Sequence, residues 1–241
     1  MEFLTELNWL AVGQIILIDI LLGGDNAIVI ALACRNLPDN LRLRGILWGT
    51  FGAIAIRIVL IAFAVTLLQM PFIKLVGGVL LFWIGTKLLS DDDGHGEISG
   101  SDKLLSAIKT IVVADLVMSL DNVIAIASAA EQAAGEHQLL LVIFGILVSI
   151  PIIVWGSTLV LKLMEKVPLI ITLGAALLGY LAGGMIISDV AIRDWVQTYL
   201  PHHEFVVPGM QLHLSLPGVA GAIGVVVVGS WLARRAQKRA A

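Results

Sequence analysis

The stretch DILLGGDNAIVIALA, residues 19–33, places two aspartates and an asparagine inside an otherwise apolar run. The same pattern returns 96 positions later as DLVMSLDNVIAIASA, residues 115–129. Each stretch belongs to an apolar run long enough to cross a bilayer, where a carboxylate costs roughly 2.5–3.5 kcal/mol at the helix centre. Acidic residues in such a place point to a functional site.

The composition agrees with a membrane protein. Hydrophobic residues make up 59% of the 241 residues and charged residues only 14%, whereas soluble domains carry roughly a quarter charged residues. The sequence therefore predicts an all-α, polytopic membrane protein. A single cysteine, Cys34, excludes a disulfide within the chain.

Apolar runs bounded by Pro, Gly and charged residues predict seven transmembrane helices. These helices are expected near residues 9–34, 42–69, 71–89, 104–130, 138–162, 167–188 and 214–233. Three further segments are expected between or after them: a solvated cytoplasmic loop at 90–103, an external connector at 189–213 with a short amphipathic helix along the membrane surface, and a basic tail at 234–241.

The basic residues predict the orientation. With seven spans, twelve of the fifteen Lys and Arg residues fall on one side of the membrane. They are Arg35, Arg42, Arg44, Lys87, Lys103, Lys109, Lys162, Lys166, Arg234, Arg235, Lys238 and Arg239. The positive-inside rule places this side in the cytoplasm, so the N-terminus is expected outside and the C-terminus inside.

The 96-residue offset extends beyond the acidic motif, because Gly49 aligns with Gly145 and Gly78 with Gly174. It spans three helices, so repeat 1 (about 9–89) corresponds to repeat 2 (about 104–188). A repeat of three helices inserts its second copy upside down, which is typical of secondary transporters with a site near the bilayer midplane. We expect one transmembrane domain, residues 1–241, with an inverted 3 + 3 repeat and an added seventh helix.

The negative charges of four intramembrane aspartates must be offset by cations or protons. Arg57 is the only basic residue predicted at a comparable depth. One Arg cannot neutralise four carboxylates, so the imbalance predicts a bound cation or several protons. Gly23 and Gly24 would allow the first helix to bend and bring its two aspartates together. Carboxylate, amide and carbonyl oxygens suit Mn²⁺, Mg²⁺ or Ca²⁺. The candidate metal ligands are Asp19, Asp25, Asn26, Asp115, Asp121 and Asn122.

Other roles for these residues stay open. As alternatives to metal ligation, one aspartate pair would carry protons, and Asn26 and Asn122 would form hydrogen bonds between helices. Arg57 is expected to be a counter-ion to an aspartate. The predicted spans contain no cluster of His or Cys, which argues against a dedicated Zn²⁺ or Cu⁺ site.

The pair GGDNA and ADLVMSLDNVIAIA, each on a long helix, resembles the TerC family of integral membrane proteins, in its short bacterial branch. The resemblance covers nearly the whole chain. It implies Mn²⁺ efflux across the bacterial cytoplasmic membrane, and it carries the family's acidic motif onto the six residues named above. The spans by themselves indicate a divalent-cation site, and the choice of manganese comes from the resemblance.

The predicted function is therefore a secondary transporter that exports a divalent cation, in exchange for protons, with no prosthetic group and no nucleic-acid partner. No Walker A motif is present, so ATP coupling within this chain is not expected. Two alternatives are an exporter of a small organic solute and an intramembrane aspartyl protease. The protease lacks support because Leu22 and the second copy, MSLDN, break the expected Gly-x-Gly-Asp. A Gly-rich seventh helix would suit packing against a neighbouring helix or a second protomer.

Overall fold

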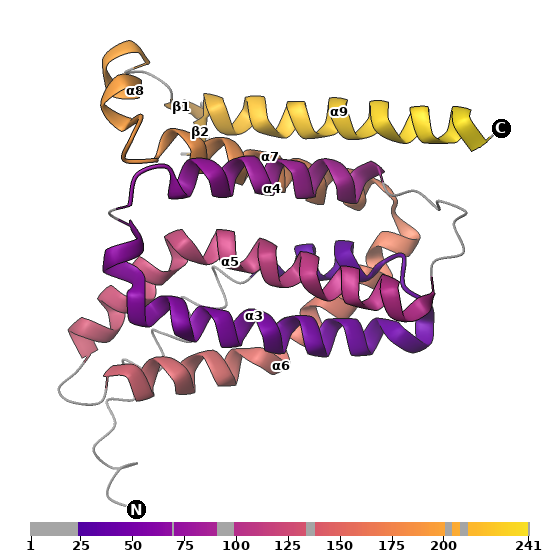
Figure 1. Cartoon of the computed structure of the whole chain (residues 1–241), viewed down its shortest axis with the longest axis horizontal. Coiled ribbons are helices and arrows are strands. Elements are labelled where there is room, and N and C mark those ends of the chain that lie inside the picture. Colours follow the sequence, from indigo (N-terminus) through magenta and orange to yellow (C-terminus); the bar gives the residue numbers. More distant parts are fainter. Residues whose placement is uncertain are drawn as a thin grey trace, which may run out of the picture. The chain divides into compact units, whose positions relative to one another are not determined.

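A computed structural model describes residues 24–68, 70–90, 99–133, 138–200, 204–207 and 212–240. Its labelled helices are α3 (Asp39–Leu68), α4 (Ile73–Ser90), α5 (Gly100–Ala133), α6 (Gln138–Lys166), α7 (Leu169–Ile187), α8 (Arg193–Tyr199) and α9 (Leu216–Ala240). A further apolar helix, Gly24–Cys34, precedes α3. Two short strands, β1 (Glu204–Val207) and β2 (Leu212–Ser215), pair antiparallel between α8 and α9 (Figure 1).

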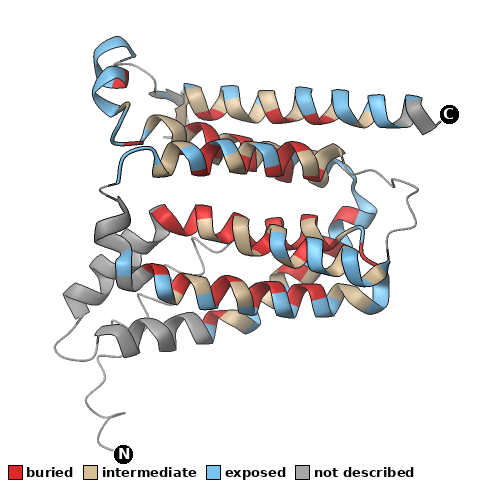
Figure 2. Cartoon of the chain, viewed as in Figure 1, coloured by how far each residue is buried: buried red, intermediate tan, exposed pale blue. Residues whose placement is uncertain are grey.

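The helical prediction is confirmed for this part of the chain. Five of the helices described are long and apolar enough to cross a membrane. Large apolar side chains such as Phe51 and Trp155 are more than 60% exposed, as expected for residues that face lipid. Along α3 and α4, buried and exposed residues alternate around the helix (Figure 2). The inverted 3 + 3 repeat stays a prediction, and most of the first expected helix lies outside the described residues.

The structure differs from the prediction at several helix ends and in the connector before α9. Helix α5 begins at Gly100, four residues early, with Asp102 in its first turn where an acidic residue favours the helix. Helix α9 continues through the predicted tail to Ala240, because Ala, Arg, Lys and Gln are strong helix formers. The segment 189–213, which was predicted to be an external connector, contains the two-stranded hairpin as well as the short helix α8.

The helices form two compact units. Unit 1 contains the helix Gly24–Cys34, most of α3, α5 and most of α6; unit 2 contains α4, α7, α8, the hairpin and α9. Each unit therefore takes helices from both halves of the chain.

In unit 1, glycines allow α3 to approach its neighbours closely. A Cβ at Gly52 would lie 2.8 Å from Val112 on α5, and a Cβ at Gly45 would lie 3.0 Å from the Cys34 sulfur. On α6, a Cβ at Gly156 would come within 3.7 Å of Ala27, so this helix packs beside the helix Gly24–Cys34. These contacts link four helices of unit 1: Gly24–Cys34, α3, α5 and α6.

Unit 2 is built on small residues. Helices α4, α7 and α9 lie side by side (Figure 1), and a Cβ at Gly183 or Gly179 of α7 would overlap the backbone of α9 at Pro217 or Gly221. Without a hydrophobic driving force between helices in lipid, such close backbone packing holds them together.

A buried carboxylate joins two helices of unit 2. Asp189, just after α7, is fully buried, and its Oδ1 accepts hydrogen bonds from the backbone N–H groups of Phe72 (2.9 Å) and Ala191 (2.8 Å). Its Oδ2 accepts one from Leu75 at 3.0 Å. Asp189 therefore satisfies free N–H groups at the start of α4, in the manner of an N-cap supplied by a distant residue.

Candidate functional site

The first turn described in the helix Gly24–Cys34 contains two of the predicted ligands. Asn26 is 4% exposed, and neither the nitrogen nor the oxygen of its side-chain amide has a hydrogen-bond partner among the residues described. Asp25 is half-buried, and its Oδ1 accepts the backbone N–H of Asn26 at 2.8 Å. A buried amide without a partner costs about 1–3 kcal/mol, so its presence calls for a functional explanation.

A buried ion pair connects α3 to α5. The Arg57 Nη2 atom lies 2.5 Å from Asp115 Oδ1, and the two side chains are 3% and 6% exposed. Ser119, one helical turn after Asp115, closes the group: Arg57 Nε donates to its hydroxyl oxygen, and that hydroxyl donates to Asp115 Oδ2, both at 3.1 Å. The prediction that Arg57 is a counter-ion to an aspartate is confirmed.

Asp25 belongs to the same electrostatic environment, since it interacts through space with both Arg57 and Asp115. The three charged groups come from three helices of unit 1: Gly24–Cys34, α3 and α5. Two carboxylates and one guanidinium leave a net charge of −1 when both acids are ionised. In that state the described part of the site is negative and rich in oxygen, which suits a hard divalent cation.

The structure brings together Asp25, Asn26 and Asp115 among the six predicted ligands. Asp19 lies outside the described residues, and so do the side chains of Asp121 and Asn122, although both positions are within α5. Among the described residues, no three His, Cys, Asp or Glu side chains form a ready metal cluster. The full ligand set therefore stays a prediction.

Thr50 was not among the predicted site residues. It is 2% exposed, and its hydroxyl has no hydrogen-bond partner in the described part of the chain. Thr50 precedes Arg57 by seven residues on α3, which places both on one helix face. This seven-residue spacing is the sequence feature that could have identified Thr50 as a neighbour of the site.

Comparisons with known proteins place the chain in a family. Residues 4–238 match the TerC integral membrane protein family. The chain is 47% identical to the uncharacterized membrane protein YjbE of Bacillus subtilis over 190 residues, 76% of this chain and 85% of that protein. It is 27% identical to YceF of Bacillus subtilis, covering 75% of this chain and 72% of YceF.

A third relative is the inner membrane protein YgdQ of Escherichia coli K12, at 32% identity over 51% of this chain and 60% of that protein. No solved structure matches the chain. The family match over nearly the whole length and the resemblance to YjbE lead to one conclusion. The chain belongs to the TerC family of integral membrane proteins.

Proposed function

We propose that this protein is a secondary transporter that exports a divalent metal ion, with Mn²⁺ as the preferred cargo, across a bacterial cytoplasmic membrane. The observation that carries the proposal is the buried amide of Asn26, which has no hydrogen-bond partner among the described residues and lies next to Asp25. An amide oxygen and a carboxylate held ready in a buried place are suited to replace water around a hard cation.

In this mechanism, Asp25 supplies the charge that attracts the cation, and Asn26 supplies a neutral oxygen. Asp19, Asp121 and Asn122 would complete the coordination. Rocking of the two repeats would then expose the site to one side of the membrane at a time. Carboxylates that release the cation would take up protons, which offsets the cost of leaving them charged in a buried place and couples export to proton entry.

The choice of manganese rests on the resemblance to the family, and the oxygen-rich site supports divalent cations in general. Export of an organic anion would need a cationic group for the substrate. Arg57, the basic residue of this site, is instead engaged by Asp115 and Ser119.

Transport into inverted membrane vesicles that contain a divalent-sensitive dye tests the proposal. We expect Mn²⁺ uptake with the wild-type chain and at least a roughly tenfold loss with Asp25→Asn, because the variant removes the charge that attracts the cation. Asp194→Asn, which changes an exposed carboxylate on α8, is the matched control and should transport like wild type. Uptake by Asp25→Asn equal to that of the control would overturn the role of Asp25.

A further inference from the structure

Arg57 is an unusual residue for a cation site, because it places a permanent positive charge inside it. The guanidinium is buried on α3, and Arg stays protonated under all physiological conditions. A guanidinium has donors only and cannot ligate a metal. Its presence must therefore change the charge that a transported cation meets.

The hydrogen bonds divide the site into two sides. On one side, both carboxylate oxygens of Asp115 already have partners: Oδ1 pairs with Arg57, and Oδ2 accepts from Ser119. On the other side, the amide of Asn26 has no partner in the described part of the chain, and Asp25 is half-buried next to it. Asp115 and Asp25 therefore differ in how far their surroundings already satisfy them.

We propose that Arg57 is a positioning residue that acts as a cation attached to the chain: it neutralises Asp115, leaves Asp25 and Asn26 to contribute as direct ligands, and holds the affinity for the divalent cargo low enough for release. This inference rests on the proposed function and assigns different roles to its residues. It differs from the six-ligand prediction, because Asp115 becomes the counter-ion of Arg57.

The physical reason is the strength of electrostatic interactions in a buried site. At an effective dielectric constant of about 20, two unit charges 4 Å apart interact by about 4 kcal/mol, and a divalent ion doubles such an interaction. A further unpaired carboxylate at Asp115 would therefore strengthen the attraction for a divalent cation and slow its release. The fixed charge of Arg57 reduces that attraction while its forked geometry keeps Asp115 in place.

Mn²⁺ binding to the purified full-length chain, followed by the loss of the free Mn²⁺ signal in electron paramagnetic resonance, tests the inference. Arg57→Met should bind Mn²⁺ at least roughly tenfold more tightly than wild type, because Asp115 becomes available. Arg57→Lys, which keeps the charge, should stay within about threefold of wild type. Arg44→Met, an exposed Arg about 20 Å away along α3, is the matched control and should not change the affinity.

The double variant Arg57→Met/Asp115→Leu tests whether Asp115 acts as the counter-ion of Arg57 or as a metal ligand. Replacing both members of a buried ion pair by apolar residues is tolerated far better than removing one, so this variant keeps the test valid even if a single variant does not fold. We expect its affinity within about threefold of wild type.

Two results have distinct meanings. If the double variant loses binding as Asp25→Asn does while wild type binds, Asp115 is a ligand and this inference is wrong, but the proposed function stands. If wild type itself binds no divalent cation, the proposed function is wrong.

Discussion

Asn26 combines deep burial with a side-chain amide that has no hydrogen-bond partner among the residues described. A residue selected for stability would not keep this arrangement, because each unpaired buried polar group costs about 1–3 kcal/mol. An apolar residue of similar size would remove that cost. Asn26 therefore offers a direct test of whether the site was built for binding or for packing.

We predict that Asn26→Leu keeps or raises the melting temperature of the purified protein and weakens the stabilisation by added Mn²⁺. A ligand that binds only the folded state stabilises that state by about 2.7 kcal/mol at a hundredfold excess over its Kd. The rise in the melting temperature of the wild-type protein on adding Mn²⁺ should therefore be easy to measure. Tryptophan fluorescence during heating, with and without Mn²⁺, provides the readout. A variant that melts several degrees lower without metal would show that the amide has a structural role.

Asp189 shows the opposite use of a buried carboxylate. Burial raises its pKa, but the backbone N–H groups of Ala191, Leu75, Phe72 and Lys74 favour the ionised form and together lower the pKa below its ordinary value. The residue is therefore a charged cap between α7 and α4. We predict that Asp189→Ala costs about 3 kcal/mol and that Asp189→Asn costs less, because the amide keeps one acceptor oxygen.

The lowered pKa of Asp189 also sets a pH dependence. The folded-state pKa lies below that of the unfolded chain, so the stabilisation is fully present above about pH 4 and is lost as the pH falls through the folded value. The difference in melting temperature between wild type and Asp189→Asn should shrink over this range. Asp194→Asn, at an exposed carboxylate, should show no such difference at any pH.

At the scale of the elements, the three long helices of unit 2 depend on contacts between backbones. Gly183 faces the carbonyl of Pro217 on α9, whereas Gly184, the next residue on α7, has open space where a Cβ would stand. Adjacent glycines on one helix thus have different surroundings and provide a matched pair.

We predict that Gly183→Ala destabilises the protein by about 1–3 kcal/mol, because its methyl group would force α7 away from α9. Gly184→Ala should be neutral or stabilising by up to about 1 kcal/mol, because Ala has the higher helix propensity. Thermal unfolding in the same detergent compares the two variants. Equal melting temperatures would show that α7 and α9 do not need this close approach.

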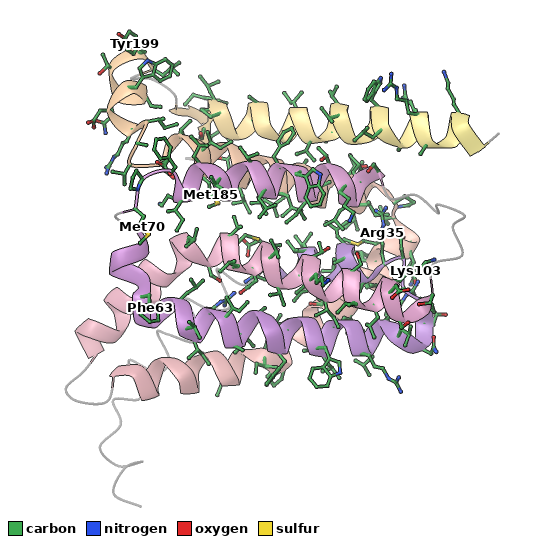
Figure 3. The ribbon with its side chains drawn as sticks, in the orientation of Figure 1. Arg35, Phe63, Met70, Lys103, Met185 and Tyr199 are labelled. Atoms are coloured by element: carbon green, nitrogen blue, oxygen red, sulfur yellow. The ribbon has the colours of Figure 1, made fainter. Side chains whose placement is uncertain are left out.

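At the scale of the whole molecule, the positions of the basic residues predict the orientation in the membrane. In unit 1, Arg35 and Lys103 lie at the same end, away from Phe63 near the other end of α3 (Figure 3). The structure thus brings together two of the segments that the sequence assigns to one side.

We predict that the C-terminus is cytoplasmic. A green fluorescent protein fused after Ala241 should fluoresce, and alkaline phosphatase at the same position should be inactive. Alkaline phosphatase fused after Tyr199, in the predicted external connector, should be active and serves as the control. An active enzyme at the C-terminus would reverse the orientation.

Much of the helical fold could be predicted because its signals are local. Apolar runs between Pro, Gly and charged residues gave the six long helices α3–α7 and α9 to within a few residues at most ends. The hairpin between α8 and α9 was missed, since four-residue strands such as EFVV carry too little pattern to identify alone. The extension of α9 beyond residue 233 was not predicted, because the predicted end was placed where the apolar residues stop. The helix continues past that point because the residues that follow favour helix.

The sequence by itself determined that this is a helical membrane protein with carboxylates and asparagines in places that a bilayer disfavours, since hydropathy and its violations can be counted along the chain. It also determined that Arg57 must pair with an aspartate, because a buried charge needs a partner. Only the tertiary structure decided which aspartate: Asp115 pairs with Arg57 and Ser119, and the Asn26 amide is left without a partner in the described chain. The physical reason is that a hydrogen bond depends on distances of about 3 Å between side chains on different helices, and these distances exist only once the helices have packed.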